Sequence, residues 1–214
     1  MKILAFADIH GRFEKVASVL HAGHKPDVVI VAGDITQFGG PADVDEALRL
    51  WRPVAPVLFA VAGNLDTPAI EQHLQNVGIS LNARCREVNG VAFYGCSAAP
   101  ISIGTPYEIG EEEIAARLQQ AAAGCKNAQR RVLVTHAPPH LVLDRTHSGV
   151  HAGSRAVREF VERDQPQLTI CGHIHEAAGQ ERLGPTLVVN CGPAMRGHYA
   201  VIELDGQGCR AELF

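Results

Sequence analysis

Three apolar segments, each closing on glycine or another small residue and then a polar one, constrain the fold of this chain most. The polar endings recur at steps of roughly 26 to 30 residues, which matches the size of a βαβ unit. Continuous apolar runs are typical of parallel strands that are buried on both faces. The segments are residues 2–7, 27–32 and 57–62, and the polar residues after them are Asp8, His10, Asp34 and Asn64. Because parallel strands bring their carboxyl ends to one edge, we expect these side chains to lie close together.

Helical spacing of apolar residues follows each predicted strand. Residues 12–22 and 42–51 show this spacing, and the second segment places Trp51 in the core. Thr67-Pro68 opens a third helix, with proline at a tolerated first-turn position. An alternative for the first loop is that Asp8 caps the helix and His10 is an ordinary loop residue.

The second half of the chain predicts further strands and helices. Asn89-Gly90 is a hairpin turn between strands at residues 84–88 and 91–95. A helix from residue 111 to about 123 begins with three glutamates that suit its dipole, so we assign them a capping role. Ser154 is a candidate cap for the next helix. Strands are expected at residues 131–136 and 167–171, and short strands that complete a second sheet at residues 186–190, 199–204 and 209–213.

The length and composition are those of a globular protein with one domain over residues 1–214. No apolar stretch reaches the roughly 18 to 20 residues of a spanning helix, so no membrane partner is expected. The acid at Asp8, after a very short apolar run, is wrong for a secretory signal. A formal net charge of -4 does not indicate a basic surface, which argues against nucleic acid as a partner. The oligomeric state is left open.

The cysteines are spread singly along the chain. They form no C-x-x-C pair and no dense framework, in a chain long enough to fold without covalent links. We therefore expect mostly buried, reduced thiols and a cytoplasmic location. The six cysteines are Cys85, Cys96, Cys125, Cys171, Cys191 and Cys209.

Histidines close two of the later strands. His136 ends the apolar segment 131–136, and Gly172-His173-Ile174-His175 follows the strand at 167–171. Along an extended segment, His173 and His175 would point the same way, as two metal ligands in a cleft would. The alternative is a surface turn with two polar residues, since short motifs have false positives.

Together, the polar residues at the strand ends supply ligands for two metal ions. One carboxylate must bridge the ions, and Asp34 is the natural bridge. Nitrogen and oxygen donors without a thiolate suit Mn, Fe, Zn, Ni or Co, of which we favour Mn. The seven candidate ligands are Asp8, His10, Asp34, Asn64, His136, His173 and His175.

These motifs, spanning residues 8–175, resemble the calcineurin-like metallophosphoesterase family, and in particular its small Icc-related branch. The resemblance implies an α/β fold, a four-layer α-β-β-α sandwich with two central mixed sheets. It also implies that Asp8, His10, Asp34 and His175 hold one metal, and that Asp34, Asn64, His136 and His173 hold the other. Its motifs are Asp8-x-His10, Gly33-Asp34, Gly63-Asn64-x-Asp66, His136 and Gly172-His173-x-His175.

The implied function is metal-dependent hydrolysis of a phosphodiester or a small phosphomonoester. Two ions about 3.5 to 4 Å apart can clamp the phosphoryl oxygens and generate a hydroxide for in-line attack. A nuclease or a protein phosphatase ranks lower, because the chain has no basic stripe and no obvious capping domain. The alternative from a different class is a catalytically weak scaffold that binds metal or a partner protein on the same fold.

Position 65 departs from the pattern, because many family members have a histidine where this chain has Leu65. Leucine cannot protonate a leaving group, a contribution typically worth about 10² to 10⁴-fold. His140, His147 and His151 could substitute, and for each the alternative is an exposed loop histidine or a secondary ligand. Asp66 is expected to cap the helix that begins at Thr67, although in the family this acid supports neighbouring site residues.

We therefore assign roles to residues beyond the ligand set. The catalytic candidates are Asp34, Asn64 and His151. The candidates for substrate contacts are Arg12, Asn64, His140 and His147. A solvated first-turn arginine is the alternative for Arg12, and the sequence does not place His198 relative to the site.

Overall fold

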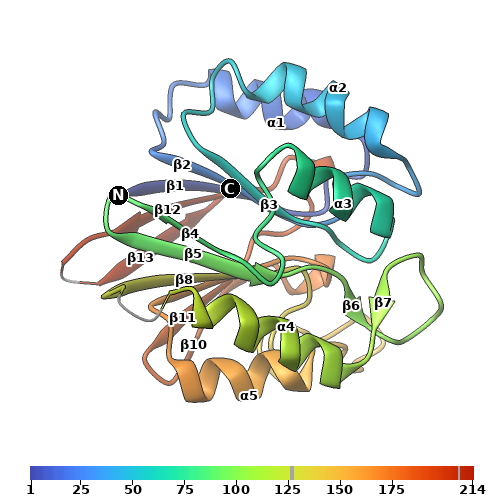
Figure 1. The fold of residues 1–214 in the computed structure, drawn as a ribbon, viewed down its shortest axis with the longest axis vertical. Coiled ribbons are helices and arrows are strands. Elements are labelled where there is room, and N and C mark those ends of the chain that lie inside the picture. Colours follow the sequence, from blue (N-terminus) through green and yellow to red (C-terminus); the bar gives the residue numbers. More distant parts are fainter. Residues whose placement is uncertain (126–127, 207) are drawn as a thin grey trace.

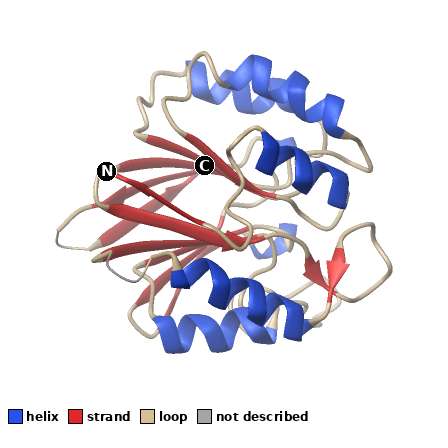
Figure 2. Ribbon diagram, viewed as in Figure 1, coloured by secondary structure: helices blue, strands red, loops and turns tan. Residues whose placement is uncertain are grey.

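Two β-sheets pack face to face and helices cover their outer faces, as a computed structural model shows (Figures 1 and 2). The structure describes residues 1–125, 128–206 and 208–214. The layers follow the order helix, sheet, sheet, helix, and the fold is the predicted α/β sandwich with two central mixed sheets.

The first sheet has the order β13-β12-β1-β2-β3. Strands β1, β2 and β3 are parallel, as the repeated units predicted, and β12 joins β1 antiparallel. Nearly every position of these three strands is buried, which accounts for their continuous apolar sequences. The bounds are β1 Lys2–Phe6, β2 Val28–Ala32, β3 Leu58–Val61, β12 Ala200–Leu204 and β13 Cys209–Leu213.

The second sheet has the order β10-β11-β9-β8-β5-β4. Its four central strands β11, β9, β8 and β5 are parallel, and antiparallel strands form both edges. The predicted hairpin at Asn89-Gly90 joins β4 to β5. The bounds are β4 Cys85–Val88, β5 Val91–Cys96, β8 Arg130–Thr135, β9 Leu168–Cys171, β10 Gly179–Leu183 and β11 Thr186–Asn190.

The helices divide between the two outer faces. Helices α1, α2 and α3 lie on the side of the first sheet, and α4 and α5 pack together on the second (Figure 1). Thr67 and Ser154 cap α3 and α5 through their side-chain oxygens. The bounds are α1 Phe13–His21, α2 Pro41–Trp51, α3 Pro68–Asn76, α4 Glu111–Ala123 and α5 Arg155–Asp164, with short 3-10 helices at His175–Ala177 and Ala194–Arg196.

The side chains of each central strand alternate between two cores. Ile30 and Val132, for example, lie between the sheets, whereas Val29 and Leu133 face the helices. Trp51, the last residue of α2, is 2 % exposed, as predicted, and its Nε1–H donates to the Phe13 carbonyl. Burying a side chain of this size dominates the local packing energy.

The last strands differ from the prediction in one respect. We expected all three to complete the second sheet, but only β11 does so, whereas β12 and β13 extend the first sheet beside β1. The local sequence pattern of a strand is the same whichever of the two sheets it joins, because long-range packing determines which strands pair. The sequence analysis also did not identify β10 or the small pair β6 Ala99–Pro100 and β7 Glu108–Ile109.

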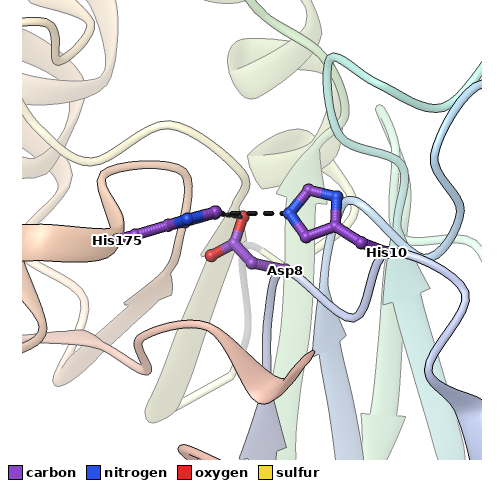
Figure 3. A group of neighbouring side chains, drawn as sticks. All are labelled: Asp8, His10 and His175. Atoms are coloured by element: carbon purple, nitrogen blue, oxygen red, sulfur yellow. Dashed lines mark hydrogen bonds and ion pairs between the residues drawn. The ribbon is translucent and has the colours of Figure 1, made fainter. Parts of the chain in front are cut away.

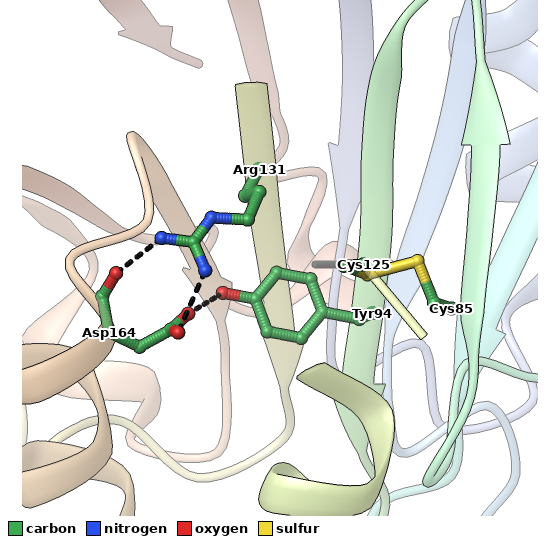
Figure 4. Close-up of a disulfide and its surroundings, with 5 residues drawn as sticks. All are labelled: Cys85, Tyr94, Cys125, Arg131 and Asp164. Atoms are coloured by element: carbon green, nitrogen blue, oxygen red, sulfur yellow. Dashed lines mark hydrogen bonds and ion pairs between the residues drawn. A yellow bond between two sulfur atoms is a disulfide. The ribbon is translucent and has the colours of Figure 1, made fainter. Parts of the chain in front are cut away.

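The expectation of reduced cysteines is wrong for one pair. Cys85 at the start of β4 and Cys125 after α4 form a disulfide with their Cα atoms 5.9 Å apart (Figure 4). They are 40 residues apart in sequence, so their spacing gave no sign of the pairing. Cys96, Cys171, Cys191 and Cys209 are free and buried, as expected. Disulfides are rare in reducing compartments, so the cytoplasmic location stays a prediction that this bond does not support.

Beside the disulfide, one polar network links the second sheet to α5 (Figure 4). The Tyr94 hydroxyl donates to the Asp164 carboxylate at 2.5 Å, and Arg131 donates to the same residue at 2.8 Å. Burial and the neighbouring Asp164 raise the pKa of Tyr94 well above its usual range. We assign this network a structural role, because it joins two strands to the end of a helix.

Among the described residues, no helix combines the length and the apolar character that crossing a bilayer requires.

Candidate metal centre

The candidate ligands follow the carboxyl ends of five strands, which meet at one edge of the two sheets. Asp8 and His10 follow β1, Asp34 follows β2 and Asn64 follows β3. His136 follows β8 in the second sheet, and His173 and His175 follow β9. The structure therefore brings together all seven side chains that the sequence analysis selected.

The backbone at this edge is unusually constrained. Four candidate ligands adopt the left-handed region, with φ values of 54° at Asp8, 48° at His10, 49° at Asp34 and 70° at His173. Such conformations are costly for residues other than glycine and cluster at functional sites. The turn at His173 also differs from the extended segment that we predicted, so His173 and His175 diverge.

Two glycines allow the loops to approach one another. A Cβ at Gly63 would collide with the carboxylate and the backbone of Asp34. A Cβ at Gly172 would collide with Ala7 and with the carboxylate of Asp8. The glycine that precedes a ligand in each motif is therefore required by the packing of one ligand loop on another.

The first group consists of Asp8, His10 and His175, which converge in Figure 3. The Nε2 atoms of His10 and His175 lie 3.3 Å apart, and His175 Nε2 lies 3.4 Å from Asp8 Oδ1. The Asp8 carboxylate also accepts a hydrogen bond from the His173 backbone N–H at 3.0 Å. Two imidazole nitrogens at this distance must share a proton or a cation, because their lone pairs otherwise repel.

The second group centres on His136, which is fully buried. Its Nδ1–H donates to the Ala32 carbonyl at 2.9 Å, which directs Nε2 toward Asn64 Oδ1 at 2.9 Å and Asp34 Oδ1 at 3.5 Å. A backbone carbonyl that fixes the ring in this way is typical of histidines that bind metal. The His173 ring lies beside it, with the ring centroids 4.9 Å apart.

Asp34 lies between the two groups. Its Oδ1 is 3.5 Å from His136 Nε2, and its Oδ2 is 4.0 Å from His10 Nε2. The Leu65 backbone N–H also donates to Oδ1 at 2.8 Å. This is the position that a bridging carboxylate requires. Asp8 is a second shared residue, because its carboxylate lies near ligand atoms of both groups.

The protonation of the four histidines follows their surroundings. Burial opposes a charge on His136, but the attraction of Asp34 outweighs it and raises the pKa of His136 to about 9. Burial and the neighbouring His136 lower the pKa of His173 to about 4. Burial also lowers the pKa of His10, whereas the hydrogen bond to Asp8 raises the pKa of His175.

His136 therefore keeps a proton at neutral pH while the neighbouring His173 is neutral. The proton on His136 Nε2 lies between two oxygen acceptors, where a cation would also be stabilised. The buried Nδ1 of His10 has no hydrogen-bond partner within the described residues. The nitrogen and oxygen donors, their burial and the lack of a thiolate suit divalent transition-metal ions.

Asp66 supports this site and does not cap α3, which corrects our expectation for this residue. Its buried carboxylate accepts hydrogen bonds from the backbone N–H groups of Ile35, Thr36 and Gly63, and from the Thr36 hydroxyl. It thus joins the loops after β2 and β3. Burial and the charge of Asp34 raise the pKa of Asp66 to about 6 against these hydrogen bonds.

The three loop histidines lie in two different environments. His151 Nδ1 is 2.6 Å from Asp144 Oδ1, and His140 Nδ1 is 3.4 Å from Asp144 Oδ2. Asp144 is only 1 % exposed and also accepts the backbone N–H groups of Leu141 and Gly153. The His147 side chain is exposed, and its backbone N–H donates to Glu176. Within the described ranges, no hydrogen bond or ion pair joins these three rings to the candidate ligands.

Two further candidates lie outside the cluster. Arg12 is exposed at the start of α1, and its side chain forms no hydrogen bond or ion pair with another described residue. His198 is exposed beside Gly192 in the loop before β12. Within the described residues, neither side chain forms a hydrogen bond or an ion pair with a candidate ligand.

The sequence analysis did not identify two residues that shape the site. Asp144 orients His151, and Thr105 accepts a hydrogen bond from Asn64 Nδ2 at 3.0 Å. The position of Asp144, in a loop eight residues after the strand-final His136, could have indicated its role. No local signal indicates Thr105, because its contact joins residues 41 positions apart.

Two stacked sheets with aspartate, asparagine and histidine ligands at their shared edge define a metal-dependent phosphoesterase. Residues 1–177 match the calcineurin-like phosphoesterase family. An uncharacterized protein of Methanocaldococcus jannaschii is 32% identical over 202 residues, which cover 90% of this chain and 88% of that protein. The chain therefore belongs to the calcineurin-like phosphoesterase family, as its motifs predicted.

Solved structures show the same fold. The protein TT1561 of Thermus thermophilus matches with a TM-score of 0.77 and 18% identity over 99% of this chain and 97% of that chain. A dimetal phosphatase from Danio rerio matches with a TM-score of 0.66 and 12% identity, covering 100% of this chain and 98% of that chain. These similarities confirm the predicted sandwich.

Proposed function

We propose that this protein hydrolyses a phosphodiester or a small phosphomonoester at a centre of two divalent metal ions. The observation that carries the proposal is the position of Asp34, whose two oxygens face the two ligand groups. Asp8, His10 and His175 would hold one ion, and Asn64, His136 and His173 would hold the other. Manganese is the ion that we favour, since the ligands are oxygen and imidazole nitrogen.

When bound, such ions would neutralise the phosphoryl oxygens and lower the pKa of the attacking water. The chain's own part is largely positioning. Ala32 orients the His136 ring, Thr105 orients the Asn64 amide, and Asp66 holds the loops that carry Asp34 and Asn64. The family relationship supports this proposal, and so does the name of the Danio rerio neighbour, which is a dimetal phosphatase.

We further propose that His151 protonates the leaving group in place of the histidine that the family has at position 65. Asp144 binds His151 Nδ1, which fixes the tautomer and leaves Nε2 free to donate a proton. The support for this role is that His151 is the loop histidine held directly by a buried carboxylate at 2.6 Å. His140 and His147 are proposed to contact the substrate together with Asn64 and Arg12.

The decisive experiment combines metal analysis with turnover of bis-p-nitrophenyl phosphate. Two equivalents of metal and turnover that a chelator abolishes are expected for the wild-type protein. Asp34→Asn should reduce turnover by more than about 100-fold, because the amide cannot bridge two cations. Its folding, measured by circular dichroism and urea unfolding, should remain intact.

Asp45→Asn is the matched control, because Asp45 is an exposed acid on α2 that pairs with His73. It should retain wild-type turnover. Full activity after chelation, or in Asp34→Asn, would contradict the proposal. Two bound ions without any turnover would instead favour a metal-binding scaffold, the alternative that the leucine at position 65 raises.

A further inference from the structure

Exposed apolar residues lie on two loops that hydrogen bonds connect to the candidate metal centre. Phe38 is 61 % exposed, Ile101 72 % and Ile103 86 %, and the half-buried Leu65 is joined to Phe38 by a backbone hydrogen bond. We call these four residues the apolar lip. Single exposed apolar residues are common on protein surfaces, but several beside one site indicate a binding surface.

Hydrogen bonds attach the apolar lip directly to the candidate ligands. The Leu65 N–H donates to Asp34, and the Leu65 carbonyl accepts the Phe38 N–H at 3.0 Å. The loop that carries Ile101 and Ile103 reaches Asn64 through Thr105 at 3.0 Å. The apolar lip is therefore connected to Asp34 and Asn64 through these hydrogen bonds.

The chain fixes the conformation of two parts of the apolar lip. Phe38 has a φ of 60°, a left-handed conformation that a bulky residue rarely adopts. The loop at residues 102–105 wraps around the Glu108 carboxylate, which accepts the backbone N–H groups of all four loop residues. Ile103 is thus presented to solvent by a preorganised loop, and Ile101 immediately precedes this loop. A ligand that covers both side chains would recover their hydrophobic free energy.

The charges around the apolar lip indicate what covers it. Residues 35–40, 64–67 and 97–110 contain no lysine, arginine or histidine. A polyanionic substituent, such as a second phosphate or a nucleic-acid strand, would find no cationic side chain within these segments. The Arg117 guanidinium, which donates to the Tyr107 hydroxyl, is paired with Glu113. An alkyl or aryl substituent needs no cationic partner.

We propose that the substrate is a phosphoester with an apolar alkyl or aryl substituent, and that the apolar lip binds this substituent. The inference rests on the proposed function, because the metal centre defines where the phosphoryl group lies. In this arrangement Leu65 helps to bind the apolar substituent and so determines specificity. The leucine at position 65 then has a function of its own.

The first test uses p-nitrophenyl alkyl phosphodiesters with Mn²⁺, in which the leaving group stays constant and the alkyl chain grows from methyl to hexyl. We expect kcat/KM to rise about twofold per methylene, which corresponds to half the free energy of full burial, or about 30-fold over the series. The Ile101→Ser/Ile103→Ser variant should flatten the series without loss of folding, since both side chains are exposed. Phe214→Ser is the control, because this exposed residue lies at the end of β13, at the opposite edge of the sheet from β3.

The second test measures binding without turnover. Calorimetry with methylphosphonate and hexylphosphonate, which have no ester bond to hydrolyse, should show tighter binding and a more negative heat-capacity change for the hexyl compound. This difference should disappear in the double isoleucine variant.

Equal binding of the two phosphonates and equal kcat/KM for methyl and hexyl esters would overturn the inference and leave the proposed function in place. A hexyl preference in binding without hydrolysis of any ester would contradict the proposed function alone. A wild-type dimer in sedimentation that the double isoleucine variant dissociates would overturn the inference, because a second copy would then cover the apolar lip.

Discussion

Asp34 lies between the two groups of candidate ligands. Its oxygens face histidines from both groups, and its backbone is held in the left-handed region by the turn after β2. The sequence indicated this role because glycine and aspartate end a buried strand. It could not indicate that Asp8 is also shared, since that depends on how the loops after β1 and β9 pack.

The dyad of Asp144 and His151 gives a prediction at the residue scale. His151→Ala should leave hydrolysis of p-nitrophenyl esters within about twofold, because p-nitrophenolate departs without protonation. Hydrolysis of esters with alkoxide leaving groups should fall by about 10² to 10⁴-fold. The measurement is kcat/KM over a leaving-group series and over pH.

His21→Ala is the control for this prediction, because His21 is an exposed histidine in the last turn of α1 and has no proposed role at the site. Asp144→Asn should change the pH profile in the same sense as His151→Ala, since the amide no longer stabilises a charged imidazole. An equal loss for both kinds of leaving group would show that His151 acts on structure and not as the acid.

At the scale of elements, one glutamate links two helices. The Glu111 carboxylate at the start of α4 accepts the Ser154 hydroxyl at 2.6 Å and the backbone N–H groups of Arg155 and Ala156 at 2.9 and 3.0 Å. We assigned the glutamates a capping role at the start of their own helix, α4. Glu111 does cap a helix, but that helix is α5. The sequence could not show this, because the contact joins residues 43 to 45 positions apart.

Removing this contact should destabilise the protein measurably. Glu111→Ala should lower the free energy of unfolding by about 1 to 2 kcal/mol, because three donors at the start of α5 lose a charged acceptor. This corresponds to a decrease in Tm of about 2 to 8 °C for a chain of this size. Glu112→Ala is the control, since Glu112 is exposed on the same turn. An equal decrease in both variants would contradict the assignment.

Periodicity predicted the elements well where the pattern was local. The helices at Phe13–His21 and Pro41–Trp51 and the hairpin at Asn89-Gly90 agree with the prediction to within a residue or two. The pair β6 and β7 was missed because each strand has only two residues and no alternation to detect. The disulfide and the partners of β12 and β13 depend on tertiary packing alone.

At the scale of the whole molecule, the candidate ligands come from two different sheets. The packing of one sheet on the other therefore determines how far apart these side chains lie. A metal ion that binds the folded state alone should therefore stabilise the entire sandwich. At a concentration of about 100 Kd, Mn²⁺ should add about 2.7 kcal/mol and raise Tm by about 5 to 10 °C. The measurement is thermal unfolding with and without a chelator, and Asp34→Asn should show little increase.

The same stabilisation should depend on pH. His136 has a pKa of about 9 in the metal-free protein, so a metal ion must displace its proton. Affinity should therefore rise as pH increases toward 9, and the Mn²⁺-dependent increase in Tm should be larger at about pH 8 than at about pH 6. An increase in Tm that is equal at both pH values would argue that His136 does not bind the ion.

The placement of β12 and β13 has a consequence for synthesis on the ribosome. Strand β1 leads into Asp8 and His10 but pairs with residues 200–203, which leave the ribosome after every candidate ligand has emerged. Until then β1 is an open edge of the first sheet, with a row of unpaired backbone groups and an almost wholly apolar sequence. The nascent chain thus carries an aggregation-prone strand edge beside the candidate ligands. Pairing of the β12–β13 hairpin with β1 then covers that edge.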